Sequence, residues 1–175
     1  MRFKQHIKLL DGERVFLRPL KAEDAALYPD FLKEVSVQDL RLRFFSAMRE
    51  LSTAAIDKLV HYDPAQAMAF IAIEERTGRM LGVVRLHDDA DDKNAEFAIL
   101  VRSRLKGRGL GWLMMKHMIA NAKDKGLKTV HGQVLAENAT MLAMCGELGF
   151  HVHDDMLERG IKRVTLPLDD APAPT

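Results

Sequence analysis

The sequence predicts an α/β or α+β fold in which helices cover both faces of one mixed central sheet. The order of its segments leads to this prediction, because a hairpin of strands comes early and strands alternate with helices later. The size agrees: 175 residues with 47% apolar and 29% charged side chains can form one domain with a substantial core. We expect residues 1–168 to form this domain and residues 169–175, DDAPAPT, to be a flexible tail.

The first predicted elements are a strand and two helices. Residues 14–20, RVFLRPL, alternate between apolar and polar side chains and predict a strand. Residues 22–36 carry apolar side chains at helical spacing, although Pro29 can break this helix in two. Residues 48–62 predict a second helix, with Ser52 as its cap.

A hairpin and then an alternation of strands and helices follow. Residues 67–75 and 80–88 read as strands separated by the turn RTGR, which predicts a hairpin. A strand at 95–101 leads through a glycine-rich segment into a helix at 110–125, and Gly126 ends that helix. The remaining predicted elements are a strand at 128–136, a helix at 138–150 and one or two strands that include 160–168.

Composition and charge narrow the class of protein. A net charge of +1 gives no reason to expect binding to nucleic acid or to an anionic membrane surface. No apolar run approaches the roughly 18 residues needed to span a bilayer, and the first residues lack the apolar stretch of a signal peptide. The single cysteine, Cys145, excludes an intrachain disulfide and suits a reducing compartment. Together these features predict a soluble cytoplasmic protein.

Three glycines, Gly107, Gly109 and Gly111, stand at the start of the helix predicted at 110–125. Glycine forms helices about 1 kcal/mol less well than alanine, so these positions need another explanation. A helix N-terminus offers unpaired backbone N–H groups, and glycines let a phosphate approach that backbone closely. Positive charge near this segment comes from Arg102, Arg104, Lys106 and Arg108. The segment therefore predicts a cradle for a pyrophosphate, or, more simply, a flexible basic loop between a strand and a helix.

Two common phosphate-binding motifs do not fit this segment. A Walker A loop needs lysine after its last glycine, where Trp112 stands. The dinucleotide-binding fingerprint needs a third glycine, and Trp112 and Met114 occupy the two positions where it would fall.

The segment from 94 to 150 resembles the GNAT N-acetyltransferase superfamily throughout. The family loop Q/R-x-x-G-x-G/A matches Lys106-Gly107-Arg108-Gly109-Leu110-Gly111, with Lys106 at the Gln/Arg position. A second register, from Arg104 to Gly109, also fits the letters. Residues 137–150, ENATMLAMCGELGF, are similar to the asparagine-led helix of the family that ends in L-G-F. Within the superfamily the sequence is most similar to the acetyltransferase domain of bacterial Pat-type protein lysine acetyltransferases, at 40–51, 67–73, 95–102 and 105–115.

This resemblance implies a mostly antiparallel central sheet and the direct transfer of an acetyl group from acetyl-CoA to an amine, without a metal. The Pat-type similarity implies protein lysines as acceptors, such as those of acyl-CoA synthetases. Two alternatives remain: transfer to a small-molecule amine, and a non-catalytic acyl-CoA-binding regulatory module. Pat-type domains often accompany large acyl-CoA-synthetase-like domains, so the chain is expected to be a stand-alone enzyme or one domain of a larger one. The implied CoA contacts are the main chain of Ile99, Leu100 and Val101, the loop residues Lys106, Gly107, Arg108, Gly109, Leu110 and Gly111, and Asn138.

Glu96 is the candidate general base. An acceptor lysine has an ordinary pKa near 10.4, so a base must take its proton before it attacks the thioester. A carboxylate on a buried strand suits this task, because burial raises its pKa, and the family often places a base at this position. The alternative is that Glu96 faces solvent at the polar start of its strand. The family also implies that strand 95–101 diverges from strand 128–136 to admit the pantetheine arm.

Three further features have a structural and a functional interpretation. Asn138 either caps its helix or touches the pantetheine arm. Cys145 stands where many family members carry a tyrosine acid for the leaving thiolate, but a lone helical cysteine favours a core position. His151 and His153 share one face of a strand, and without a third ligand at a recognisable spacing we expect them to be surface residues.

Overall fold

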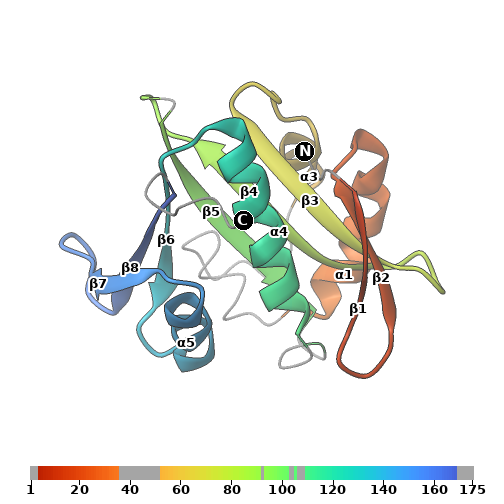
Figure 1. The fold of residues 1–175 in the computed structure, drawn as a ribbon. Coiled ribbons are helices and arrows are strands. Elements are labelled where there is room, and N and C mark those ends of the chain that lie inside the picture. Colours follow the sequence, from red (N-terminus) through yellow and green to blue (C-terminus); the bar gives the residue numbers. More distant parts are fainter. Residues whose placement is uncertain (1–3, 36–51, 92, 103–104, 106–108, 169–175) are drawn as a thin grey trace.

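An eight-stranded sheet runs through the molecule in the order β1-β2-β3-β4-β5-β6-β8-β7 (Figure 1). The computed structural model describes residues 4–168 except 36–51, 92, 103–104 and 106–108. All neighbouring strands pair antiparallel except β5 and β6, which are parallel, so the predicted mixed, mostly antiparallel sheet is confirmed. The strands are β1 Gln5–Lys8, β2 Arg14–Pro19, β3 Ala67–Glu74, β4 Met80–Asp88, β5 Asn94–Val101, β6 Thr129–Leu135, β7 His151–Asp154 and β8 Ile161–Pro167.

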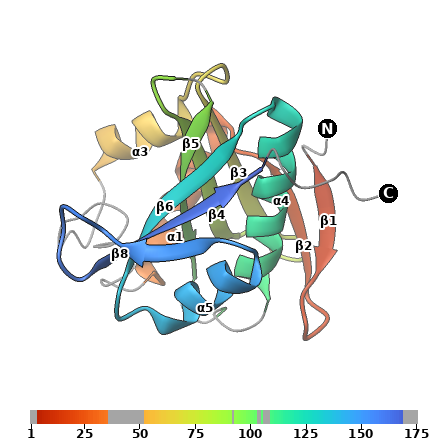
Figure 2. The same cartoon turned by 60° about the vertical axis from the view of Figure 1, so that its left-hand side comes forward.

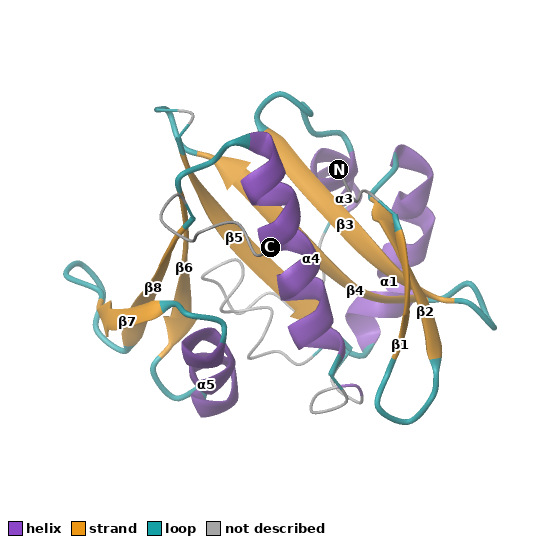
Figure 3. Ribbon diagram, viewed as in Figure 1, coloured by secondary structure: helices purple, strands orange, loops and turns teal. Residues whose placement is uncertain are grey.

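Helices cover both faces of this sheet, as predicted (Figures 2 and 3). On one face lie α4 and α5, and on the other lie α1, α3 and the short 3-10 helix η1. In the part of the chain that is described, no helix is long and apolar enough to cross a membrane. The helices are η1 Ala22–Leu27, α1 Tyr28–Lys33, α3 Thr53–Val60, α4 Leu110–Lys125 and α5 Ala139–Glu147.

Each face of the sheet has its own hydrophobic core, because side chains alternate along the strands. On β3, Phe70 and Ala72 belong to the core beneath α4, whereas Ala69 and Ile71 belong to the core beneath α1 and α3. The methionines of α4 (Met114, Met115 and Met118) are buried in the first core, and Met141 and Met144 of α5 pack against it. These five methionines therefore fill the core, as their spacing predicts.

Two of the predicted helices can be compared with those observed in detail. The helix predicted at 22–36 is divided in two, as Pro29 allowed: η1 ends at Leu27, and α1 begins at Tyr28 with Pro29 in its first turn. At that position the missing N–H of proline costs nothing. The second helix begins at Thr53, and Ser52 caps it as predicted, by accepting the N–H of Ala55 at 3.1 Å. The predicted start at 48–51 lies outside the described residues.

The two outermost strands are short and paired on one side only. The sequence analysis missed β1, whose four residues lie alongside β2. It anticipated a strand around 151–153, and β7 is observed there, paired with β8. The bounds of β4 and α4 agree with the prediction residue for residue.

Candidate active site

The parallel strands β5 and β6 pair over only three residues and then diverge (Figure 3). Asn94, Ala95 and Glu96 pair with Thr129, Val130 and His131, and the pairing stops there. Both strands continue, β5 to Val101 and β6 to Leu135. The divergence implied by the family resemblance is therefore present, with Glu96 and His131 at its closed end.

An aromatic side chain sits at the point where the strands separate. Gly132 is the first residue of β6 beyond the pairing, and a Cβ placed on it would lie 2.5 Å from Cε1 of Phe97. Phe97 is buried, and its ring packs edge-on against Phe150 with a centroid separation of 5.5 Å. The ring of Phe97 therefore packs directly over the backbone of Gly132, where the gap begins. We call this pair of residues the aromatic wedge.

The main chain of β5 beyond Glu96 forms one edge of the gap. The other edge of β5 pairs with β4, and just beyond it the N–H of Arg102 donates to Leu81 O at 3.0 Å. Main-chain groups alternate in direction along a strand, so those of Leu100 also point toward β4. Those of Ile99 and Val101 point into the gap. Of the three residues expected to contact CoA through their main chain, Ile99 and Val101 thus direct their main-chain groups into the gap, and Leu100 directs them toward β4.

The N-terminus of α4 lies at the end of this strand and carries no side-chain cap. Its N-cap, Gly109, has φ 90°, a left-handed conformation that glycine adopts without strain. Leu110 is buried, and Gly111 lies near Met144 of α5. The first N–H groups of a helix have no partner within it, so this end can receive an anion. Predicted loop residues Arg104, Lys106, Gly107 and Arg108 lie outside the described residues.

Glu96 is exposed on the face of the sheet opposite α4. Its neighbours on the same strand, Ala95 and Phe97, are buried on the other face. Across the sheet it pairs with His87 of β4 and His131 of β6. The expectation that burial surrounds this carboxylate is wrong, because the side chain leaves the strand where α1 and α3 no longer cover the sheet.

Asn138 and Cys145 both have structural roles in α5. The Asn138 side chain caps the helix by accepting the N–H of Met141 at 3.2 Å. Cys145 is fully buried in the core beneath α4, and burial raises the pKa of its thiol to about 12. A thiol that is buried and so weakly acidic does not serve as an acid for a leaving group in the gap.

We expect Cys145→Ala to leave kcat within about twofold of the wild type, since general-acid catalysis is worth about a hundredfold or more. In the folded protein the thiol should resist a thiol-specific chromogenic reagent and react only on unfolding. Because its pKa rises from 9.0 to about 12 on folding, its contribution to stability is full below about pH 9 and is lost toward pH 12. Rapid labelling of the native thiol would contradict this assignment.

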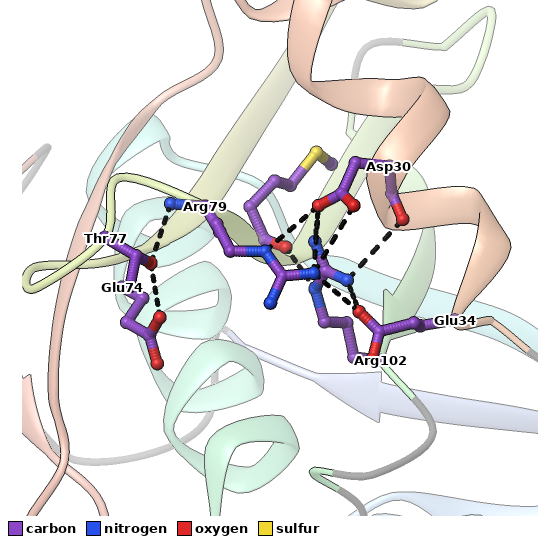
Figure 4. A network of polar contacts seen from close by, with 7 residues as sticks. Asp30, Glu34, Glu74, Thr77, Arg79 and Arg102 are labelled. Carbon is purple, nitrogen blue, oxygen red and sulfur yellow. Dashed lines mark hydrogen bonds and ion pairs between the residues drawn. The ribbon is translucent and has the colours of Figure 1, made fainter.

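Arg102 follows β5 directly, yet it does not contribute positive charge to the glycine loop as predicted. Its side chain is fully buried, and its Nε donates to Met80 O at 2.6 Å (Figure 4). Its guanidinium also forms ion pairs with two carboxylates. One is Asp30 of α1, at 2.7 Å, and the other is Glu34, the residue that follows α1. Arg79 bonds to the same two carboxylates, and the hydrogen bonds from Arg79 and Arg102 lower the pKa of Asp30.

We expect Arg102→Met to lower the free energy of unfolding by about 1–2 kcal/mol, because it leaves the buried carbonyl of Met80 without its partner. Urea denaturation measures this change. Arg79→Met is the matched control, since Arg79 is 40% exposed and exposed ion pairs are worth only about 0–1 kcal/mol. Equal losses in the two variants would show that the buried bond adds nothing.

A polar cluster beside Glu96 escaped the sequence analysis. It lies at the closed end of the gap, on the face opposite α4, and comprises Asp89, His131, Gln133, Asp155 and Arg163. The alternation of side chains along residues 129–135, TVHGQVL, was the available signal for this cluster. It places His131 and Gln133 on one polar face of β6. The partners from other segments could not be assigned without the fold.

The two histidines of β7 do not form a metal site in this structure. His151 and His153 are exposed, and His153 Nε2 lies 3.3 Å from Oγ1 of Thr165. Within the described residues, no group of three or more His, Cys, Asp or Glu side chains is placed to hold a metal ion.

Comparisons with known proteins agree with this geometry. A family model for the acetyltransferase (GNAT) domain matches residues 14–151. The chain is 31% identical over 142 residues to acetyltransferase PA5475 of Pseudomonas aeruginosa, covering 80% of this chain and 76% of that protein. It is 26% identical over 144 residues to acetyltransferase Pat of Mycolicibacterium smegmatis, covering 82% of this chain but only 43% of that protein. The crystal structure of the GNAT domain of S. lividans PAT superposes with a TM-score of 0.87 at 25% identity, covering 95% of this chain and 97% of that one.

Proposed function

This chain belongs to the GNAT acetyltransferase family, an acetyl-CoA-dependent class of transferases, and we propose that it acetylates the side-chain amine of protein lysines, such as those of acyl-CoA synthetases. The resemblance to Pat-type lysine acetyltransferases supports this choice of acceptor, as does the similarity to the S. lividans PAT domain. The single observation that carries the proposal is the gap between β5 and β6, with a carboxylate at its closed end.

In this proposal the backbone provides most of the donor site. The N-terminus of α4 receives the pyrophosphate of CoA, and Gly109 and Gly111 leave its backbone accessible. The family resemblance adds Lys106, Gly107 and Arg108, which lie outside the described residues, to the groups that bind CoA. Main-chain groups of Ile99 and Val101 pair with the pantetheine arm and polarise the thioester carbonyl. Asn138 caps α5 at the other side of the gap and also reaches the arm.

Glu96 performs the proton transfer. Its carboxylate accepts a proton from the acceptor ammonium, and the free amine then attacks the carbonyl carbon of the thioester. A carbon–nitrogen bond forms and the carbon–sulfur bond breaks. The attacking nitrogen releases its second proton to water, and the CoA sulfur leaves as a thiolate that takes a proton from water, because Cys145 is fully buried in the core. In this proposal the acceptor approaches Glu96 from the face opposite α4, where this side chain is exposed.

An acetylation assay with a protein acceptor tests the proposal. The purified chain is incubated with acetyl-CoA and an acyl-CoA synthetase, released CoA thiol is measured, and mass spectrometry locates the acetyl groups. We expect faster turnover with the protein than with any of a panel of amino acids, polyamines and aminoglycosides. Faster turnover with a small amine would show that this amine, and not a protein lysine, is the acceptor. Binding of acetyl-CoA without turnover would indicate a regulatory module.

A further inference from the structure

A chain of polar contacts crosses the closed end of the gap on the side where Glu96 lies. His131 Nε2 lies 2.9 Å from Oδ2 of Asp89, a residue of the connection between β4 and β5. Arg163 of β8 donates from Nη1 to Nδ1 of His131 at 3.2 Å. These contacts join the connection before β5 to β6 and β8, across the only three residue pairs that hold β5 and β6 together in the described structure.

The partners of His131 determine which ring nitrogen carries its proton. A guanidinium can only donate, so Nδ1 must be the unprotonated nitrogen that accepts from Arg163. Nε2 then carries the proton and donates it to the carboxylate of Asp89. Both nitrogens of the imidazole are used, so the ring is held in one orientation and is not itself available as a base.

Further contacts hold Arg163 in place. Its Nε lies 4.0 Å from Oδ2 of Asp155, and Gln133 of β6 donates to the same oxygen at 2.8 Å. Asp155 also accepts the N–H groups of Leu157 and Glu158, which fixes the turn after β7. The side chain of His131 is only 15% exposed, so this set of contacts is packed and not a loose surface pair.

His131 is also the residue of β6 that pairs with Glu96. Side chains of paired residues leave a sheet on the same face, so the imidazole stands beside the carboxylate. On the other face the next residues of the two strands, Phe97 and Gly132, form the wedge. At the position where β5 and β6 separate, the contacts of His131 with Asp89 and Arg163, which we call the polar tie, lie on one face of the sheet. The aromatic wedge lies on the other face.

We propose that His131 is a positioning residue for acetyl transfer, which Asp89 and Arg163 hold so that β6 stays at a set distance from Glu96. The inference rests on the proposed function, since it assigns His131 to the same site. A displacement of about 1 Å at reacting groups can cost about a hundredfold in rate, so loss of the tie lowers kcat even when the fold persists. The donor contacts lie farther along the gap, so the KM for acetyl-CoA changes little.

The experiment compares His131→Ala, His131→Gln and the control His153→Gln, an exposed histidine on the same sheet. We expect His131→Ala to lower kcat by about ten- to a hundredfold with less than a threefold change in the KM for acetyl-CoA. His131→Gln keeps an N–H for Asp89 and should recover part of that loss, while His153→Gln should match the wild type. Imidazole ¹⁵N spectra should show the Nε2–H form in the wild type.

The outcomes separate this inference from the proposed function. An active wild type whose kcat is unchanged by His131→Ala overturns the positioning role and leaves the function intact. A wild type without turnover overturns the function instead. If His131→Ala does not fold, the ¹⁵N spectrum of the wild type decides: an Nδ1–H form overturns the inference.

Discussion

Glu96→Gln is expected to lower kcat by about a hundredfold or more, with the KM for acetyl-CoA close to the wild-type value. Glutamine keeps the size of the side chain but cannot take the proton of the acceptor ammonium, and a positioned base contributes about 10²- to 10⁴-fold to such reactions. The proposed contacts of CoA with Ile99, Val101 and the α4 N-terminus do not involve this side chain. Steady-state measurement of CoA release with saturating acceptor checks both quantities.

Glu147→Gln is the matched control for this change, because Glu147 is an exposed residue at the end of α5, away from the closed end of the gap. It should leave kcat unchanged. If Glu96→Gln and Glu147→Gln retain equal activity, another group must accept the proton. A loss in Glu96→Gln that appears only as a higher KM for the acceptor would instead make Glu96 a binding residue.

Gly132→Ala is expected to lower the free energy of unfolding by about 1–3 kcal/mol and to weaken acetyl-CoA binding. The new methyl group would lie 2.5 Å from the ring of Phe97, so the ring must move, and overpacking of this kind typically has that cost. Phe97 also packs against Phe150, so its movement shifts β6 at the point where the gap opens. Urea denaturation and calorimetric titration with acetyl-CoA measure the two effects.

Two further variants make this prediction specific. Phe97→Leu combined with Gly132→Ala should recover part of the lost stability, because the smaller side chain leaves room for the methyl group. Gly146→Ala, on α5, has no atom within 4 Å of the added carbon and should stabilise the protein by up to about 1 kcal/mol. Equal destabilisation by both alanine substitutions would show that the contact with Phe97 is unimportant.

The elements that carry long periodic patterns could be predicted from the sequence. For β4 and α4 the predicted and observed bounds are identical, because apolar periodicity extends over the whole element and Gly126 marks the end of the helix. The strand β1 has four residues, too few for alternation to stand out, and its pairing with β2 is a tertiary effect. Pro29 indicated that the helix at 22–36 is divided, because proline fits the first turn of a helix and not its interior.

The candidate site was predictable where it depends on local sequence and not where it depends on partners. The glycine at the start of α4 follows from the local sequence, and the divergence of β5 and β6 was implied by the family resemblance of these segments. Arg102 was misassigned because the carboxylates that bind it are 68 and more residues away along the chain, at Glu34 and Asp30. Likewise, the contacts of His131 come from Asp89 and Arg163, which only the folded sheet brings together.

The two separate cores have a consequence for how such a protein can diverge. Residues of α1 and α3 pack against one face of β3, β4 and β5, while α4 and α5 pack against the other. Substitutions such as those at Tyr28, Phe31 or Ile56 alter the first of these cores without contacting the side chains beneath α4. A duplicated gene can therefore vary the core beneath α1 and α3 in small steps, each of which leaves the core beneath α4 intact.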